Sequence, residues 1–161
     1  MTPKPKHDPP PPANVDAERV LLGSVLLDNA ALETAKALEA EDFFVTTHGV
    51  LWGRMTSMAG QSIPVDYVTL LEELRANGEY QMLGETPAAY IAGLTEGLPR
   101  APAVREYVRI VKAKSLQRQL LAACDAAIKK AYDGESGFTI ISVLRDNLDE
   151  IETSARRGIR A

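Results

Sequence analysis

Few residues in this sequence have the types and spacing that catalysis requires. The segment 134–137 reads Gly-Glu-Ser-Gly, which has the glycines of a phosphate-binding loop but lacks the lysine and the preceding strand that such a loop needs. Glu41 and Asp42 are adjacent carboxylates, and neighbouring side chains at a helix start point apart rather than towards one substrate. We therefore expect solvated carboxylates at these two positions, no catalytic residue, and no hydrolysis of ATP by this chain alone.

Residues that bind metals are equally sparse. His7 and His48 are far apart, and the single cysteine, Cys124, is distant from both, so the ligand spacing of a zinc site is absent. Cys124 falls within an apolar stripe, where a free thiol behaves as a small hydrophobic group. We expect no metal, no cofactor and no disulfide in this chain.

Basic side chains are the remaining polar feature with a clear pattern. The chain carries a net charge of −4, which argues against a protein whose whole surface binds nucleic acid. Residues 102–131 nevertheless include seven basic residues against only Glu106 and Asp125. Such a helix face is either simply solvated or a docking surface for an acidic partner or a phosphate backbone. The candidates for a partner surface are Arg105, Arg109, Lys112 and Arg118.

Two long amphipathic segments must position these side chains. Apolar residues recur at helical intervals on both sides of a glycine-containing turn at 132–137, which predicts an antiparallel helical hairpin over residues 101–155. A helix of about thirty residues is roughly 45 Å long, so two helices alone leave much of the stripe uncovered, and the preceding residues or another chain must cover it. The residues expected to face each other across the hairpin and to support self-association are Leu116, Leu120, Cys124, Ile128, Ile141, Leu144, Leu148 and Ile151.

The residues before the hairpin predict a bundle of short helices. Asn14 and Asp66 are N-cap candidates, and Thr86-Pro87 combines a capping residue with a proline at the first helical position. The apolar periods between them predict five or six short helices over residues 14–100 and no convincing strand. The predicted fold class is therefore all-α, with a globular helical bundle followed by a long hairpin.

The two ends of the chain are predicted to lie outside this fold. Residues 1–13 hold six of the ten prolines, a composition that favours an extended, solvated and disordered tail, or alternatively a ligand for an aromatic groove. Residues 156–161 are interpreted as the start of a linker. Neither a signal peptide nor an apolar run of about eighteen residues occurs, so we expect a cytoplasmic protein without a membrane partner.

Several short motifs, taken in order, resemble a known family. They are Ala17–Asn29, Asp42-Phe43-Phe44, His48, Ile63-Pro64-Val65-Asp66, Ala89–Leu94 and Tyr107–Lys112. Over about residues 11–155, their order and spacing resemble the N-terminal domain of the DnaB-type bacterial replicative helicase. The resemblance implies a helical body leading into a hairpin, hairpins that pair between subunits, and six copies that form a collar above a motor ring. It also implies primase as a partner, and an indirect relation to the single-stranded DNA that is led towards the motors.

The sequence departs from the family at a few points. Phe44 stands where the family usually has tyrosine, and Gly84-Glu85 replaces a glycine pair. The motor domain, which would bind ATP and Mg²⁺, is not part of this sequence, so the chain is either a domain of a longer helicase or a shortened relative. As a collar domain it would be a homo-oligomer, a dimer by itself or a hexamer in full-length form. Two alternatives are a stand-alone helical adaptor and a direct nucleic-acid binder that uses the basic helix.

Overall fold

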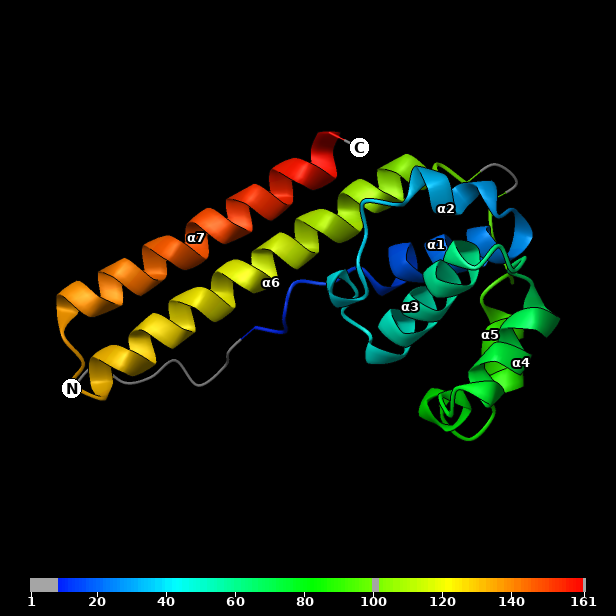
Figure 1. Cartoon of the computed structure of the whole chain (residues 1–161), viewed down its shortest axis with the longest axis horizontal. Helices are drawn as coiled ribbons and strands as arrows, with labels where there is room; N and C mark the ends of the chain where they lie inside the picture. Colours follow the sequence, from blue (N-terminus) through cyan, green and yellow to red (C-terminus); the bar gives the residue numbers. More distant parts are fainter. Residues whose placement is uncertain (1–8, 100–101, 161) are drawn as a thin grey trace.

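The fold consists of a helical head and a long two-helix arm (Figure 1). A computed structural model describes residues 9–99 and 102–160. Within those residues every regular element is a helix, so the predicted all-α class is confirmed. The head contains α1 (Val15–Leu27), α2 (Ala30–Thr34), the 3₁₀ turn η1 (Ala40–Asp42), α3 (Thr46–Gly60), α4 (Tyr67–Ala76), the 3₁₀ turn η2 (Tyr80–Leu83) and α5 (Pro87–Gly93). The arm contains α6 (Val104–Tyr132) and α7 (Gly137–Arg160).

The predicted caps set the starts of two head helices. The Asn14 side chain accepts a hydrogen bond from the amide of Ala17 at 2.9 Å, and Asp66 accepts from the amides of Val68 and Thr69 at 2.8 and 2.9 Å. These side chains satisfy amides that have no partner within the helix. α4 ends just before Gly78, which has a φ of +71° that glycine adopts without strain.

A single hydrophobic core fills the head. Trp52 on α3 lies at its centre, donates its indole N–H to the carbonyl of Leu38 at 3.0 Å, and has its ring centroid 5.4 Å from that of Phe43. Gly23 lets α1 approach the end of α5, because a Cβ atom there would lie 2.2 Å from the carbonyl oxygen of Leu94. The other large side chains that are fully buried include Leu21, Leu22, Val25, Leu51, Met55, Met58, Leu70, Leu74 and Ile91.

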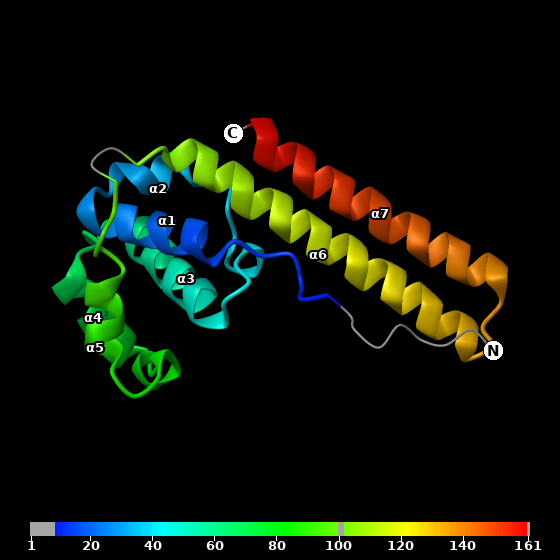
Figure 2. The ribbon, with the colours of Figure 1, turned by 180° about the vertical axis from the view of Figure 1, so that it is seen from behind.

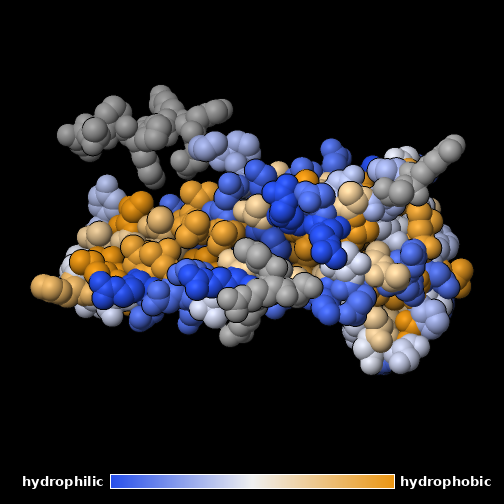
Figure 3. Space-filling model, turned by 90° about the horizontal axis from the view of Figure 1, so that it is seen from above, coloured by the Kyte–Doolittle hydropathy of each residue, from blue (hydrophilic) through white to orange (hydrophobic). Residues whose placement is uncertain are grey.

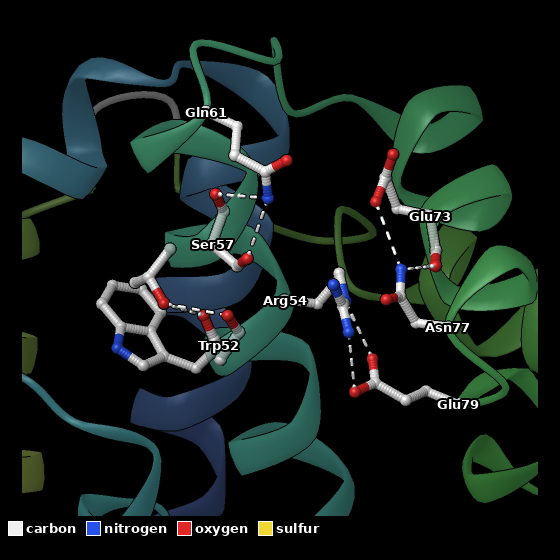
Figure 4. Close-up of polar contacts among 9 residues, drawn as sticks. Trp52, Arg54, Ser57, Gln61, Glu73, Asn77 and Glu79 are labelled. Carbon is white, nitrogen blue, oxygen red and sulfur yellow. Dashed lines mark hydrogen bonds and ion pairs between the residues drawn. The ribbon is translucent and has the colours of Figure 1, made fainter.

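An ion pair joins α3 to the segment after α4 (Figure 4). The Arg54 guanidinium donates to both carboxylate oxygens of Glu79, with both distances 2.9 Å. The hydrogen bond to Glu79 is also the main reason why the pKa of Arg54 is raised above its ordinary value. Both side chains are partly buried, and this two-pronged contact fixes the α4–η2 part of the head against α3.

The arm begins inside the head and then leaves it (Figure 2). α6 has 29 residues, which corresponds to about 44 Å. Its first turns bury Val108 and Val111 in the head core, and α1 packs against it there. Farther out, α7 is its neighbour, and the small residues Ser115 and Ala123 are buried on α6. α7 continues to Arg160, beyond position 155, where the sequence predicted that the hairpin would end.

The proline-rich tail is described only from residue 9 onwards. Residues 9–11 are exposed and non-helical, while the carbonyl of Pro12 accepts a hydrogen bond from Arg118 on α6 at 2.8 Å. The prediction of a disordered tail for residues 1–8 falls outside the described residues. The last part of the tail, at Pro12, is therefore held against α6.

Candidate interaction surface

The arm exposes a continuous apolar surface, which we call the arm face. It comprises Leu120, Leu121, Cys124 and Ile128 on α6, and Ile141 and Leu148 on α7. Ile128 and Ile141 are 54% and 56% exposed. The two rows follow helical spacing, and the geometry of antiparallel helices places them on the same side of the arm. Figure 3 shows apolar residues gathered along the arm. A contiguous patch of this kind is typical of an interaction site.

The structure divides the eight predicted hairpin residues into two groups. Leu116, Leu144 and Ile151 are half-buried, whereas Leu120, Cys124, Ile128, Ile141 and Leu148 are exposed. Small residues on α6 are more buried than the exposed members of this set, since Ser115 and Ala123 are buried and Ala127 is half-buried. Small side chains allow two helices to approach closely, and five of the eight larger residues remain exposed. Most of the predicted stripe is therefore available to another chain.

Two aromatic side chains project from the tip of the arm. Tyr132, the last residue of α6, is 89% exposed, and Phe138, near the start of α7, is 88% exposed. The sequence pattern predicted only a turn in this region. The sequence does contain a signal for this exposed pair, because one aromatic residue stands on either side of the glycine turn. That turn is the end of the hairpin farthest from the head, so the head does not cover these side chains.

A groove of about 710 Å³ lies at the base of the arm, between α2, the start of α6 and the end of α7. We call it the basal groove. Its apolar lining includes Val108, Leu116 and Ile151, and its polar lining includes Arg105 and Arg109. The volume is within the range of pockets that enclose a substantial ligand or side-chain group.

The four predicted partner-surface residues have two different roles. Arg105 and Arg109 are exposed. Lys112 instead pairs with the buried carboxylate of Asp42, with Nζ 2.6 Å from Oδ2. Arg118 donates to the carbonyls of Asp42 and Pro12 at 2.6 and 2.8 Å. Lys112 and Arg118 therefore attach α6 to the head.

This arrangement corrects the expectation of a solvated carboxylate at position 42. Asp42 is buried, and its side chain also accepts a hydrogen bond from the amide of Glu39 at 2.8 Å. The sequence separation between Asp42 and Lys112 explains the error, because only the folded chain brings a cation to this carboxylate.

Removing the amine of Lys112 should destabilise the head–arm junction. We expect Lys112→Ala to lower the free energy of unfolding by about 1–3 kcal/mol, because Asp42 remains buried without its cation. The matched control is Arg105→Ala, an exposed basic residue on the same helix, with an expected change within about 0.5 kcal/mol. Urea denaturation followed by circular dichroism measures both. Equal effects of the two substitutions would contradict this role for Lys112.

A second buried polar contact joins α1 to the start of α3. Glu18 is 1% exposed, and its carboxylate accepts hydrogen bonds from the amides of Phe44 and Val45 at 2.7 and 3.3 Å and contacts Nδ1 of His48 at 2.8 Å. Burial by itself raises the pKa of Glu18, but the hydrogen bonds from His48 and the two amides outweigh it and lower the pKa below its ordinary value. Glu18 therefore stays ionised and holds the start of α3.

Neither a cluster of metal ligands nor a membrane-spanning helix occurs in the part of the chain that is described. Over residues 9–99 and 102–160, no group of three or more His, Cys, Asp or Glu side chains gathers as metal ligands would. In the same ranges, no helix combines the length and apolar character of a membrane span.

The chain is similar to known proteins over most of its length. A family model described as "DnaB-like helicase N terminal domain" matches residues 10–113. The "Replicative DNA helicase DnaB" of Geobacillus stearothermophilus is 36% identical over 150 residues, which cover 91% of this chain and 32% of that protein. The protein of the same name from Treponema pallidum is 33% identical over 149 residues, covering 91% of this chain and 33% of that protein. The chain thus spans about a third of the length of these curated relatives.

A solved structure has the same architecture. It is the crystal structure of the N-terminal domain of DnaB helicase from Mycobacterium tuberculosis, with a TM-score of 0.78 and 26% sequence identity. The match covers 87% of this chain and 99% of that chain. The similarity therefore includes the arrangement of head and arm, and is not limited to a few local motifs.

Proposed function

This chain belongs to the family of DnaB-like helicase N-terminal domains, and we propose that it is a collar domain that self-associates through its arm and recruits primase during DNA replication. The family predicted from the sequence motifs is thereby confirmed. The proposed oligomer is a dimer for this chain alone and a hexamer in a full-length helicase. ATP and Mg²⁺ would act in a motor domain, and the collar itself is proposed to bind neither.

The arm face is the observation that supports self-association. Among residues 9–99 and 102–156, eight of the fourteen exposed large hydrophobic residues belong to α6 and α7, although the head contains the larger part of the chain. Covering this surface with a second arm removes apolar area from water on both copies, and a two-fold contact uses the same patch twice. The composition of the arm face therefore supports a partner at this surface, and a second copy supplies an identical apolar face.

The proposed primase surface is smaller than the one expected from the sequence. Of the four basic candidates, Arg105 and Arg109 remain exposed, although Arg109 pairs with Glu106 at 2.9 Å, whereas Lys112 and Arg118 are engaged with the head and the tail. The same engagement weakens the alternative of direct nucleic-acid binding, because fewer cations are available to neutralise phosphates. Single-stranded DNA is accordingly proposed as an indirect partner in the cytoplasm.

The molar mass in solution tests self-association. We expect the molar mass measured by light scattering to rise with concentration, from the 17.5 kDa of one chain towards twice that value. A chain that stays monomeric up to about 100 µM, where even a weak specific contact would be populated, would contradict self-association by this domain and favour the stand-alone adaptor.

Primase recruitment is tested by adding primase to the same samples. We expect a complex whose mass exceeds that of either protein alone, and weaker binding when Arg105 and Arg109 are both replaced by glutamate. A dimer that forms without binding primase would contradict the recruitment part of the proposal and leave the self-association part in place.

A further inference from the structure

We infer that the basal groove binds a small amphipathic anion, a molecule with an apolar body and one negatively charged group. The apolar body lies against Val108, Leu116 and Ile151, and the charged group pairs with Arg105. The groove shares no residue with the arm face, so this site does not depend on self-association.

The groove has the size of a small-molecule site. Its volume of about 710 Å³ lies within the range of about 300–1,000 Å³ that is usual for such pockets. Its walls come from α2, the start of α6 and the end of α7, which are far apart in the sequence. On α6 the lining extends from Arg105 to Gln119, which corresponds to about 21 Å of helix. The groove can therefore hold an elongated molecule.

The charges that line the groove leave one cation over. Four basic side chains and three carboxylates belong to the lining. Each carboxylate already has a cation within the chain, at 2.7, 2.9 and 2.6 Å respectively: Glu33 with Lys36, Glu106 with Arg109 and Asp42 with Lys112. The fourth cation, Arg105, forms no ion pair with any carboxylate of residues 9–99 and 102–156. A ligand with a single negative charge would balance it.

A buried hydroxyl lies on the floor of the groove. Ser115 belongs to the lining although it is only 2% exposed. Its hydroxyl accepts a hydrogen bond from the side-chain amide of Gln119 at 3.1 Å, and it donates to no acceptor in the described part of the chain. A hydroxyl also has a proton to donate, and a buried donor without a protein acceptor is usually satisfied by water or a ligand. The ligand is thus expected to carry a hydrogen-bond acceptor that reaches Ser115.

The apolar lining supplies most of the expected affinity. Transfer of apolar surface from water into the groove is favourable in proportion to the area removed. Arg105 is exposed, so solvent screens its pairing with the ligand, and the charge contributes specificity more than strength. Binding should therefore need both the apolar body and the negative group, with the body as the larger contribution.

Two matched fluorescent probes test the requirement for charge. Anilinonaphthalene sulfonate has an aromatic body and one sulfonate, and N-phenylnaphthylamine has the same body without the sulfonate. We expect the sulfonate probe to bind saturably to the wild-type chain, and Arg105→Gln to raise its dissociation constant by about two- to fivefold. The neutral probe should bind both chains equally. Failure of the sulfonate probe to saturate, or an equal effect of Arg105→Gln on both probes, would overturn the inference.

A blocking substitution tests whether the probe lies in the groove. Ala113 is exposed and lines the groove, so Ala113→Trp should fill part of it and raise the dissociation constant at least about tenfold. The control is Ala126→Trp, which changes an exposed alanine of the same helix outside the lining. Circular dichroism should show equal helicity for both variants. Equal probe binding by the two variants would place the probe elsewhere, for example on the arm face, and overturn the inference.

Occupation of the groove has a consequence for primase, and this consequence rests on the proposed function. Arg105 and Arg109 line the groove and also form the proposed primase surface, so the bound anion should compete with primase. We expect saturating anilinonaphthalene sulfonate to weaken the primase complex of the Ala126→Trp chain but not that of the Ala113→Trp chain. Equal weakening of both complexes would overturn the competition. A wild-type chain that binds no primase at all would contradict the proposed function, whereas the probe titrations still decide the ligand site.

Discussion

Replacement of Glu18 by alanine is expected to lower the free energy of unfolding by about 3–5 kcal/mol, the range for breaking a buried charged contact by removing one partner. The substitution leaves the amides of Phe44 and Val45 and the ring nitrogen Nδ1 of His48 without the carboxylate. Buried donors without an acceptor carry the full penalty of their lost hydration. Urea denaturation followed by circular dichroism measures the change.

The neighbouring residue Asp16 provides the control for this prediction. Asp16 lies in the same first turn of α1 but is exposed, so Asp16→Ala should change the free energy of unfolding by no more than about 0.5 kcal/mol. Glu18→Gln keeps the side-chain shape and one hydrogen-bond acceptor, so its loss in the free energy of unfolding should lie between those of Glu18→Ala and Asp16→Ala. Similar losses for Glu18→Ala and Asp16→Ala would show that the contribution of Glu18 is only a helix-end charge effect.

The lowered pKa of Glu18 adds a pH dependence with a defined sign. Its ordinary value is 4.5 and its value in the folded chain is lower, so the unfolded chain binds this proton more readily. The stabilising contribution of the carboxylate is therefore complete above pH 4.5 and is lost as the pH falls through the folded pKa. In the Glu18→Gln variant, which has no carboxylate at this position, this part of the loss of stability at acidic pH should be absent.

Charged substitutions on the arm face are expected to abolish self-association without unfolding the chain. Ile128→Lys and Ile141→Lys each place a charge on an exposed position of the arm face. Because the position is exposed, the charge should change the free energy of unfolding of the monomer little. In a two-fold dimer each substitution enters the interface twice, and burying an unpaired charge is unfavourable. We expect the dissociation constant to rise by at least about a hundredfold, equivalent to about 2.7 kcal/mol.

Val68 offers a matched control on the head. It is 64% exposed, comparable with the two arm isoleucines, so Val68→Lys removes a similar exposed hydrophobic side chain without affecting the arm. Light scattering should give monomers for the arm variants and wild-type association for Val68→Lys, with equal helicity by circular dichroism. Dimeric arm variants would locate the contact elsewhere, and a monomeric Val68 variant would place it on the head.

Features with a short-range cause could be predicted from the sequence. Asn14 and Asp66 cap helices because their side chains reach amides only two or three residues away. The hairpin was equally predictable, since apolar residues at helical intervals flank a glycine turn. The composition of the arm stripe was also visible, including most residues of the arm face.

The interaction surface itself could be predicted only in part. Helical periodicity identifies which side of α6 is apolar, but it does not determine how much of that side α7 covers. The structure leaves Ile128 exposed and buries Ala123, and that difference depends on how α7 lies against α6. The basal groove also depends on where α2 and the end of α7 lie relative to α6, which periodicity does not specify.

The sequence alone determined the helical class, the helix caps at Asn14 and Asp66, the hairpin and the family, since each depends on local spacing or on motifs in a fixed order. Only the tertiary structure decided that Glu18 meets His48 and that Lys112 meets Asp42, across separations of 30 and 70 residues. The physical reason is that burial and pairing change the role of a charged side chain. Glu18 and Lys112 resemble solvated surface residues in the sequence, and become structural contacts only when folding removes water from them.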